Sequence, residues 1–167
     1  MEDNDSHLHF LRISLEEAKK CTPVPTAFCV GCALVYRPPN SDPVVLATGY
    51  SRELPGNTHA EANALSKLES MSESDFSQLV GSSSKTDVLT QVDVYTTMEP
   101  CSIRTSGLAP CADALIAAKV KRCFIGVGEP DDFVNCEGAQ KLKNAGVEVT
   151  WIDGLQEECL AVARSGR

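Results

Sequence analysis

Three potential metal ligands and one carboxylate stand out along this chain of 167 residues. They are His59, Cys101 and Cys111, with Glu61 two positions after the histidine. An imidazole and two thiolates suit a tetrahedral Zn²⁺ site, and three protein ligands leave the fourth position for water. Zinc lowers the pKa of a bound water from about 15.7 to roughly 7, and a neighbouring glutamate can carry its protons. We therefore expect a catalytic zinc site with Glu61 as the proton carrier.

A closed structural zinc site is the main alternative for the same ligands. It would need a fourth ligand, and Cys123 and Cys136 are the candidates. Cys123 lies in an apolar run that predicts a strand, which argues against it, whereas Cys136 is harder to exclude. A structural site would leave Glu61 without a purpose. A non-catalytic zinc-binding interaction module thus stays open beside the catalytic hypothesis.

Composition and charge limit the partners. The formal net charge is −8, which argues against broad nucleic-acid binding, although a local pocket can still bind a small phosphorylated substrate. No apolar run approaches the roughly 18 residues that span a membrane, and the acidic start is unlike a secretory signal. We therefore expect no membrane partner, eight cysteines as reduced thiols, and a location in the cytoplasm or nucleus.

The order of apolar segments predicts one α/β domain over residues 1–167. We expect a flexible tail at 1–6, an exposed Ser-rich loop at 70–87, and regular elements elsewhere. The expected helices are 7–20, 59–68, 111–119, 135–145 and 154–164, and the expected strands lie within 28–36, 44–50, 88–97, 121–127 and 147–152. A short link makes the first two strands antiparallel, and helical crossovers make the last three parallel. The prediction is a three-layer αβα sandwich around a five-stranded mixed sheet.

Each expected metal ligand stands where a helix could begin. Cys101 follows Pro100 and Cys111 follows Pro110, and proline is favoured in the first turn of a helix. The positive end of a helix stabilises a thiolate. We expect all three ligands at helix starts just beyond strand ends, where open α/β sheets bind ligands.

The motif His59-Ala60-Glu61, followed by Glu99-Pro100-Cys101-Ser102 and Pro110-Cys111, resembles the cytidine deaminase-like superfamily, over about residues 8–160. Superfamily members acting on cytosine, cytidine or tRNA adenosine usually carry P-C-x-x-C, whereas nine residues separate the two cysteines here. This long spacer resembles the riboflavin-pathway deaminases. Its Arg104, Ser106 and Gly107 resemble the fungal type, as does the run from Gly49 to Thr58.

The resemblance implies zinc-dependent hydrolytic deamination of a riboflavin precursor. That precursor is the 2,5-diamino-6-ribosylamino- or 6-ribitylamino-4(3H)-pyrimidinone 5′-phosphate, and the fungal order of steps favours the ribityl form. A nucleoside, cytosine or tRNA-adenosine deaminase of the same fold is the alternative. Because superfamily members commonly self-associate, the resemblance also implies a homodimer.

Residues near the motif are the expected substrate contacts: Ser51, Arg52, Glu53, Asn57, Ala60, Arg104 and Ser106. A guanidinium suits either the substrate phosphate or the pyrimidine carbonyl, so Arg104 is the candidate for one of them. It could equally hold the spacer in place. Asn57 could equally cap the helix that follows it, and Ser106 could serve only the backbone of the spacer.

Overall fold

The computed structural model describes residues 3–81, 83–104, 107–130 and 136–166. Its centre is a five-stranded sheet in the order β2-β1-β3-β4-β5, with β1 antiparallel to β2 and β3, and with β3, β4 and β5 parallel. The predicted mixed sheet is confirmed. The strands are β1 (Gly31–Tyr36), β2 (Val44–Tyr50), β3 (Val92–Met98), β4 (Arg122–Val127) and β5 (Glu148–Trp151).

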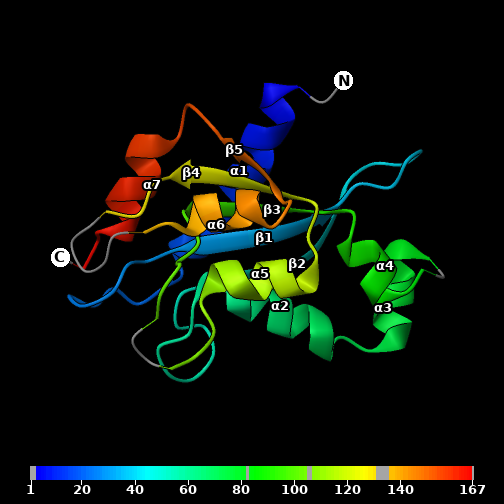
Figure 1. Ribbon diagram of the computed structural model, residues 1–167, viewed down its shortest axis with the longest axis horizontal. Coiled ribbons are helices and arrows are strands. Elements are labelled where there is room, and N and C mark those ends of the chain that lie inside the picture. Colours follow the sequence, from blue (N-terminus) through cyan, green and yellow to red (C-terminus); the bar gives the residue numbers. More distant parts are fainter. Residues whose placement is uncertain (1–2, 82, 105–106, 131–135, 167) are drawn as a thin grey trace.

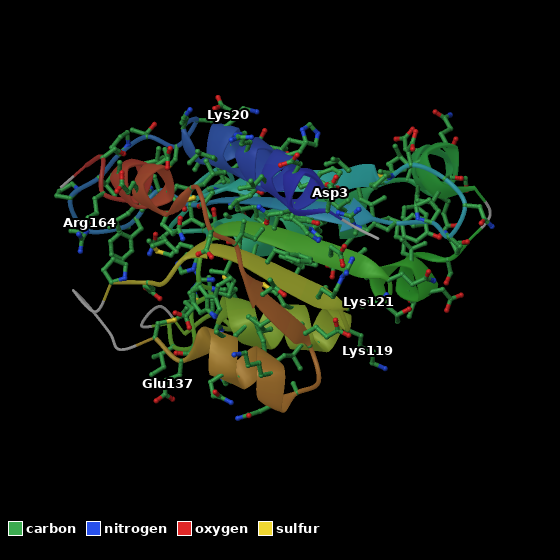
Figure 2. All side chains as sticks on the ribbon, turned by 90° about the horizontal axis from the view of Figure 1, so that it is seen from above. Asp3, Lys20, Lys119, Lys121, Glu137 and Arg164 are labelled. Carbon is green, nitrogen blue, oxygen red and sulfur yellow. The ribbon has the colours of Figure 1, made fainter. Side chains whose placement is uncertain are left out.

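Helices cover both faces of the sheet, which confirms the three layers (Figure 1). One face packs against α1 (Asn4–Ala18) and α7 (Gln156–Ala163), and the other against α2 (Ala60–Ser70), α5 (Cys111–Ala118) and α6 (Gly138–Asn144). Figure 2 shows Lys20, just beyond α1, on one side of the sheet, and Lys119 and Glu137 on the other. In the part of the chain that the structure describes, no helix combines the length and apolarity needed to cross a membrane.

Alternation along β1 shows why the sheet needs two helical layers. Cys32 and Leu34 belong to the apolar cluster under α2 and α5, whereas Ala33 and Val35 belong to the cluster under α1 and α7. Every residue of β1 is buried. Gly31 allows α1 to lie close, because a Cβ there would stand 1.8 Å from the carbonyl oxygen of Ser14.

The predicted tail at 1–6 is wrong for its described part. Helix α1 begins at Asn4, because the Asp3 side chain accepts a hydrogen bond from the Ser6 N–H at 2.9 Å and caps the helix. An aspartate in this position satisfies a backbone donor that the first turn leaves unpaired. Asp3 and Asp5 therefore belong to the start of the first helix.

The Ser-rich segment is also more ordered than predicted. It contains α3 (Glu73–Val80) and the short α4 (Lys85–Leu89) instead of one exposed loop over 70–87. Ser72 and Ser84 are the N-caps, and each side chain accepts a hydrogen bond from a backbone N–H of the first turn. Phe76 is buried in the apolar cluster beside α2 and fixes α3 there. Serines that suggested a loop thus start two helices.

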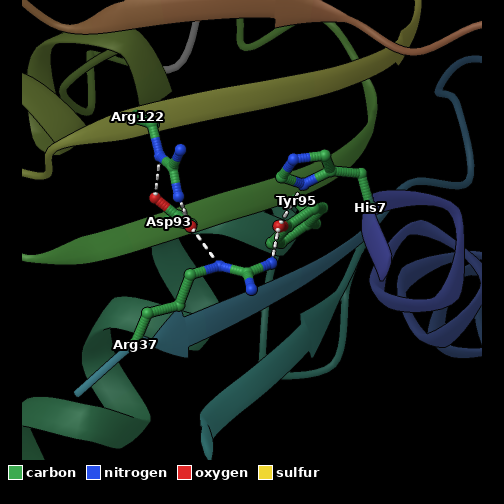
Figure 3. Close-up of polar contacts among 5 residues, drawn as sticks. All are labelled: His7, Arg37, Asp93, Tyr95 and Arg122. Atoms are coloured by element: carbon green, nitrogen blue, oxygen red, sulfur yellow. Dashed lines mark hydrogen bonds and ion pairs between the residues drawn. The ribbon is translucent and has the colours of Figure 1, made fainter. Parts of the chain in front are cut away.

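A buried ion-pair network joins four segments at the amino end of β3 (Figure 3). Asp93 is 1% exposed and lies between the guanidinium groups of Arg37 and Arg122, at 2.7 and 2.5 Å. Arg37 also donates to the Tyr95 hydroxyl at 2.7 Å, and that hydroxyl lies 2.8 Å from His7 Nδ1. The network ties α1, the end of β1, β3 and β4 together.

Replacing Asp93 by alanine should destabilise the fold, because two partly buried guanidinium groups would lose their shared carboxylate. We expect the free energy of unfolding to fall by roughly 3 kcal/mol, as for other broken buried pairs. Urea denaturation measures this, with Asp42→Ala as the control because Asp42 is exposed. Equal stability of the two variants would contradict the role given to Asp93.

Candidate metal centre and active-site pocket

The three expected ligands, far apart in sequence, meet at one point. His59 Nδ1 lies 3.5 Å from the Sγ of Cys101 and 3.5 Å from the Sγ of Cys111. All three ligand atoms lie within 4.8 Å of one another. With Zn–S near 2.3 Å and Zn–N near 2.0–2.1 Å, a tetrahedral zinc separates nitrogen and sulfur by about 3.5 Å. The donor atoms and their spacing therefore fit zinc.

Two of the ligands stand at helix starts, and the third does not. His59 is the N-cap of α2, and Cys111 is the first residue of α5. The prediction that Cys101 opens a helix of its own is wrong, because no helix begins there. Instead, the Cys111 N–H at the start of α5 donates to Cys101 Sγ at 3.2 Å. The N-terminus of α5 thus carries the Cys111 thiol and donates a hydrogen bond to the Cys101 thiol.

Hydrogen bonds prepare Cys101 to bind a cation. The Cys111 thiol, the His59 ring and the Cys111 N–H lower the pKa of the Cys101 thiol to about 4, against the opposing effect of burial. The contact with Cys101 and burial both raise the pKa of the Cys111 thiol. Zinc binds cysteine as the thiolate, so a metal that binds here would release the proton of any thiol that is still protonated.

Glu61 lies beside the ligands in the first turn of α2 and is 3% exposed. Its Oε1 accepts a hydrogen bond from the Thr96 hydroxyl at 2.8 Å. Burial raises the pKa of this carboxyl group, and negative charge on Cys101 raises it further. A carboxyl group of this kind suits proton transfer near neutral pH.

No fourth metal ligand joins the group within the described residues. Cys123 is the second residue of β4, and Cys136 donates to the Pro100 carbonyl oxygen at 3.4 Å. The candidate group comprises His59, Cys101 and Cys111. The arrangement therefore favours a site with an open coordination position over a closed structural site.

A cavity of about 340 Å³ opens beside the ligands, a size within the usual range for small-molecule sites. Four of the expected substrate contacts line it, namely Ser51, Arg52, Asn57 and Arg104. Glu53 and Ala60 do not line it, and Ser106 lies outside the described residues. Its other walls come from Thr26, Ala27, Phe28, Val30, His59, Glu61, Met98, Glu99, Cys101, Ile103 and Glu129.

Several of the residues that were expected to contact the substrate have partners within the protein. Glu53 forms an ion pair with Lys67 at 2.7 Å, and the Ser51 hydroxyl accepts a hydrogen bond from the Val30 N–H at 2.9 Å. Ala60 is fully buried at the start of α2. These contacts link the segment after β2 to α2 and to the residue before β1.

The two arginines also hold loops. Arg52 adopts a left-handed backbone with φ of 62°, and its guanidinium donates to the Phe28 carbonyl oxygen and to Cys21 Sγ. Arg104 donates to the Asn57 carbonyl oxygen at 2.8 Å, so it does link the spacer to the loop before His59. The alternative that Asn57 caps α2 is wrong, because His59 is the N-cap.

Glu129 was not expected from the sequence, yet it lines the cavity two residues beyond β4. Its Oε2 is buried and has no hydrogen-bond partner among the described residues. Burial raises the pKa of its carboxyl group. The available signal was its place at the carboxyl end of a parallel strand, where α/β proteins bind ligands.

Proteins named as riboflavin biosynthesis proteins or pyrimidine deaminases are similar to this chain in sequence. Over 161 residues the chain is 39% identical to the diaminohydroxyphosphoribosylamino-pyrimidine deaminase of Schizosaccharomyces pombe, covering 96% of this chain and 36% of that protein. It is 34% identical to the riboflavin biosynthesis protein RibD of Actinobacillus pleuropneumoniae, covering 80% of this chain and 29% of RibD. The chain thus spans about a third of the length of these curated relatives.

Solved structures share the fold. The Rib2 deaminase of Aspergillus oryzae, as a C-terminal deletion mutant at pH 4.6, superposes with a TM-score of 0.80 at 37% identity, covering 96% of this chain and 92% of that one. The same deaminase in complex with DARIPP superposes with a TM-score of 0.75 at 35% identity, covering 96% and 91%.

Residues 4–127 match the cytidine and deoxycytidylate deaminase zinc-binding region. This match spans most of the chain and contains His59, Glu61, Cys101 and Cys111. The chain therefore belongs to the cytidine and deoxycytidylate deaminase family.

Proposed function

We propose that this chain is a zinc-dependent deaminase of riboflavin biosynthesis. Its substrate would be the 2,5-diamino-6-ribitylamino-4(3H)-pyrimidinone 5′-phosphate, or its ribosylamino form, and it would release ammonia. The observation that carries this proposal is the meeting of His59, Cys101 and Cys111 beside the buried carboxylate of Glu61. Support for the substrate class comes from the fission-yeast relative and from the Aspergillus oryzae deaminase that binds DARIPP.

Zinc held by His59, Cys101 and Cys111 would supply a Lewis acid that activates the attacking water. The oxygen of that water forms a bond to the carbon that carries the amino group, while Glu61 takes one proton from the water and delivers it to the ring nitrogen of the substrate. Glu61 then takes the second proton from the same oxygen and delivers it to the departing amine. The C–N bond to the amine breaks, a carbonyl forms in its place, and ammonia leaves. Burial of Glu61 keeps bulk water from competing for these protons.

The cavity walls divide into two kinds of substrate contact. Arg104, at the wall, suits the substrate phosphate or the pyrimidine carbonyl, while still holding Asn57. Glu129 offers the unpartnered Oε2 to an amino or hydroxyl hydrogen of the substrate. Ser51, Arg52 and Asn57 also line the cavity and are further candidates for substrate contact, whereas Glu53 and Ala60 are not among its lining residues.

We also propose that the protein is a homodimer in the cytoplasm or nucleus, with a small phosphorylated substrate and no nucleic-acid or membrane partner. The resemblance to self-associating deaminases supports the dimer. The net charge of −8 supports a small substrate over nucleic acid. Sedimentation equilibrium of the purified chain tests the dimer.

The variant Glu61→Gln should lose roughly 10²- to 10⁴-fold in kcat, the usual contribution of a general acid–base, while keeping its zinc. Ammonia release from the ribitylaminopyrimidine phosphate measures the rate, and atomic absorption measures the metal. Full activity in this variant would favour a non-catalytic zinc module. Cytidine, cytosine and adenosine-bearing RNA serve as comparison substrates, and preferential release of ammonia from one of them would reverse the substrate assignment.

Removal of zinc should abolish turnover, because Glu61 would then face an unactivated water. We expect one zinc per chain in the purified protein, loss of ammonia release after dialysis against a chelator, and recovery when Zn²⁺ is added back. The variant Cys136→Ser should retain the metal, because the Cys136 thiol donates a hydrogen bond to the Pro100 carbonyl oxygen and does not belong to the ligand group. A chain that turns over at full rate without metal would contradict the proposal.

The variant Glu129→Gln should weaken substrate binding more than turnover. A hydrogen bond to a charged group contributes about 1.5–3 kcal/mol, so we expect KM to rise about tenfold or more while kcat changes little. Steady-state kinetics measures both constants. Glu148→Gln is the control, because Glu148 is exposed on β5. An unchanged KM would remove Glu129 from the substrate contacts.

A further inference from the structure

Thr96 is a buried polar residue on an otherwise apolar part of the sheet. Its cross-strand neighbours are Cys32 on β1 and Ile125 on β4, and all three residues are fully buried. Cys32 and Ile125 both belong to the apolar cluster that packs against α2 and α5. Burying a hydroxyl group in such surroundings lowers the stability of the fold unless the group is hydrogen-bonded. Its partners therefore indicate why a threonine stands here.

The Thr96 hydroxyl has two partners. Its Oγ1 lies 2.8 Å from Glu61 Oε1 and 2.9 Å from the Met98 carbonyl oxygen. A hydroxyl group has one proton and two lone pairs, so it donates to one of these oxygens at a time. Both contacts are short, so the Thr96 hydroxyl is held between the Glu61 carboxyl group and the Met98 carbonyl group.

This contact links separate parts of the site. Glu61 lies on α2, whereas Thr96 lies on β3, the strand that leads directly to Cys101. The hydrogen bond therefore fixes the position of the Glu61 carboxylate relative to β3, the strand that is followed by the metal ligand Cys101. A long side chain such as glutamate has several rotamers, and a fixed partner selects one of them.

We propose that Thr96 is a positioning residue, whose hydroxyl holds the Glu61 carboxylate in the orientation that proton transfer requires. The proposal rests on the proposed function, because it assigns Glu61 to proton transfer. Thr96 acts through Glu61 and lies behind the cavity, outside its lining. Thr96, on strand β3, thus acts together with the residues of the sequence motif.

Thr97 provides a matched control on the same strand. It is also buried, at 1% exposed, and its hydroxyl accepts a hydrogen bond from the Gly31 N–H at 3.1 Å. Because adjacent residues of a strand face opposite sides of the sheet, Thr97 points away from Glu61. Thr97→Val therefore removes a buried hydroxyl and its hydrogen bond without touching the site.

The test compares Thr96→Val, Thr96→Ser and Thr97→Val, each loaded with zinc. Thr96→Val keeps the shape of the side chain and removes the hydroxyl, so kcat should fall by about 100-fold, as expected for a displaced catalytic group. KM for the ribitylaminopyrimidine phosphate and the zinc content should stay the same. Thr96→Ser should restore kcat to within a few-fold of the unsubstituted chain, and Thr97→Val should keep kcat.

A crystal structure of zinc-loaded Thr96→Val supplies a readout that needs no substrate. We expect the Glu61 carboxylate in a different rotamer, or spread over several, with the metal ligands in place. A Glu61 carboxylate that keeps its position overturns the proposal, and so does an equal loss of kcat in Thr97→Val. If the unsubstituted chain releases no ammonia from this substrate, the proposed function fails, and the position of Glu61 still decides the role of Thr96.

Discussion

The site depends on bringing the sulfur atoms of two cysteines to 3.5 Å from one imidazole nitrogen. Three unrelated stretches of chain must end there: the loop before α2, the segment after β3 and the first turn of α5. The start of α5 provides the key contact, because the Cys111 N–H donates to Cys101 Sγ. This hydrogen bond holds the second thiol against the first and stabilises negative charge on it.

The surrounding fold fixes that meeting point through its own backbone. Glu99 accepts a hydrogen bond from the Ala139 N–H at 3.0 Å, so α6 is tied to the residue just before Pro100. Gly138 permits the approach, since a Cβ there would stand 1.7 Å from the Pro100 carbonyl oxygen. Glu99 thus links the end of β3 to α6. The segment that carries Cys101 is therefore anchored to the start of α6.

Several features followed from local patterns in the sequence. Apolar runs of strand length, separated by helical patterns, predict parallel neighbours whatever the distant contacts are, and β3, β4 and β5 are parallel. The short link after Tyr36 predicts an antiparallel pair in the same way. Serine has two local roles, in loops and at helix N-caps, so composition alone could not identify Ser72 and Ser84 as the caps of α3 and α4.

The sequence by itself determined which residues are the candidates for metal binding and proton transfer, namely His59, Cys101, Cys111 and Glu61, because ligand type and motif order are local properties. Tertiary structure alone decided which groups surround them. Thr96 reaches Glu61 across 35 positions in the chain, and Glu129 enters the cavity from beyond β4. Such contacts depend on how strands align and helices pack, and no spacing along the chain encodes them directly.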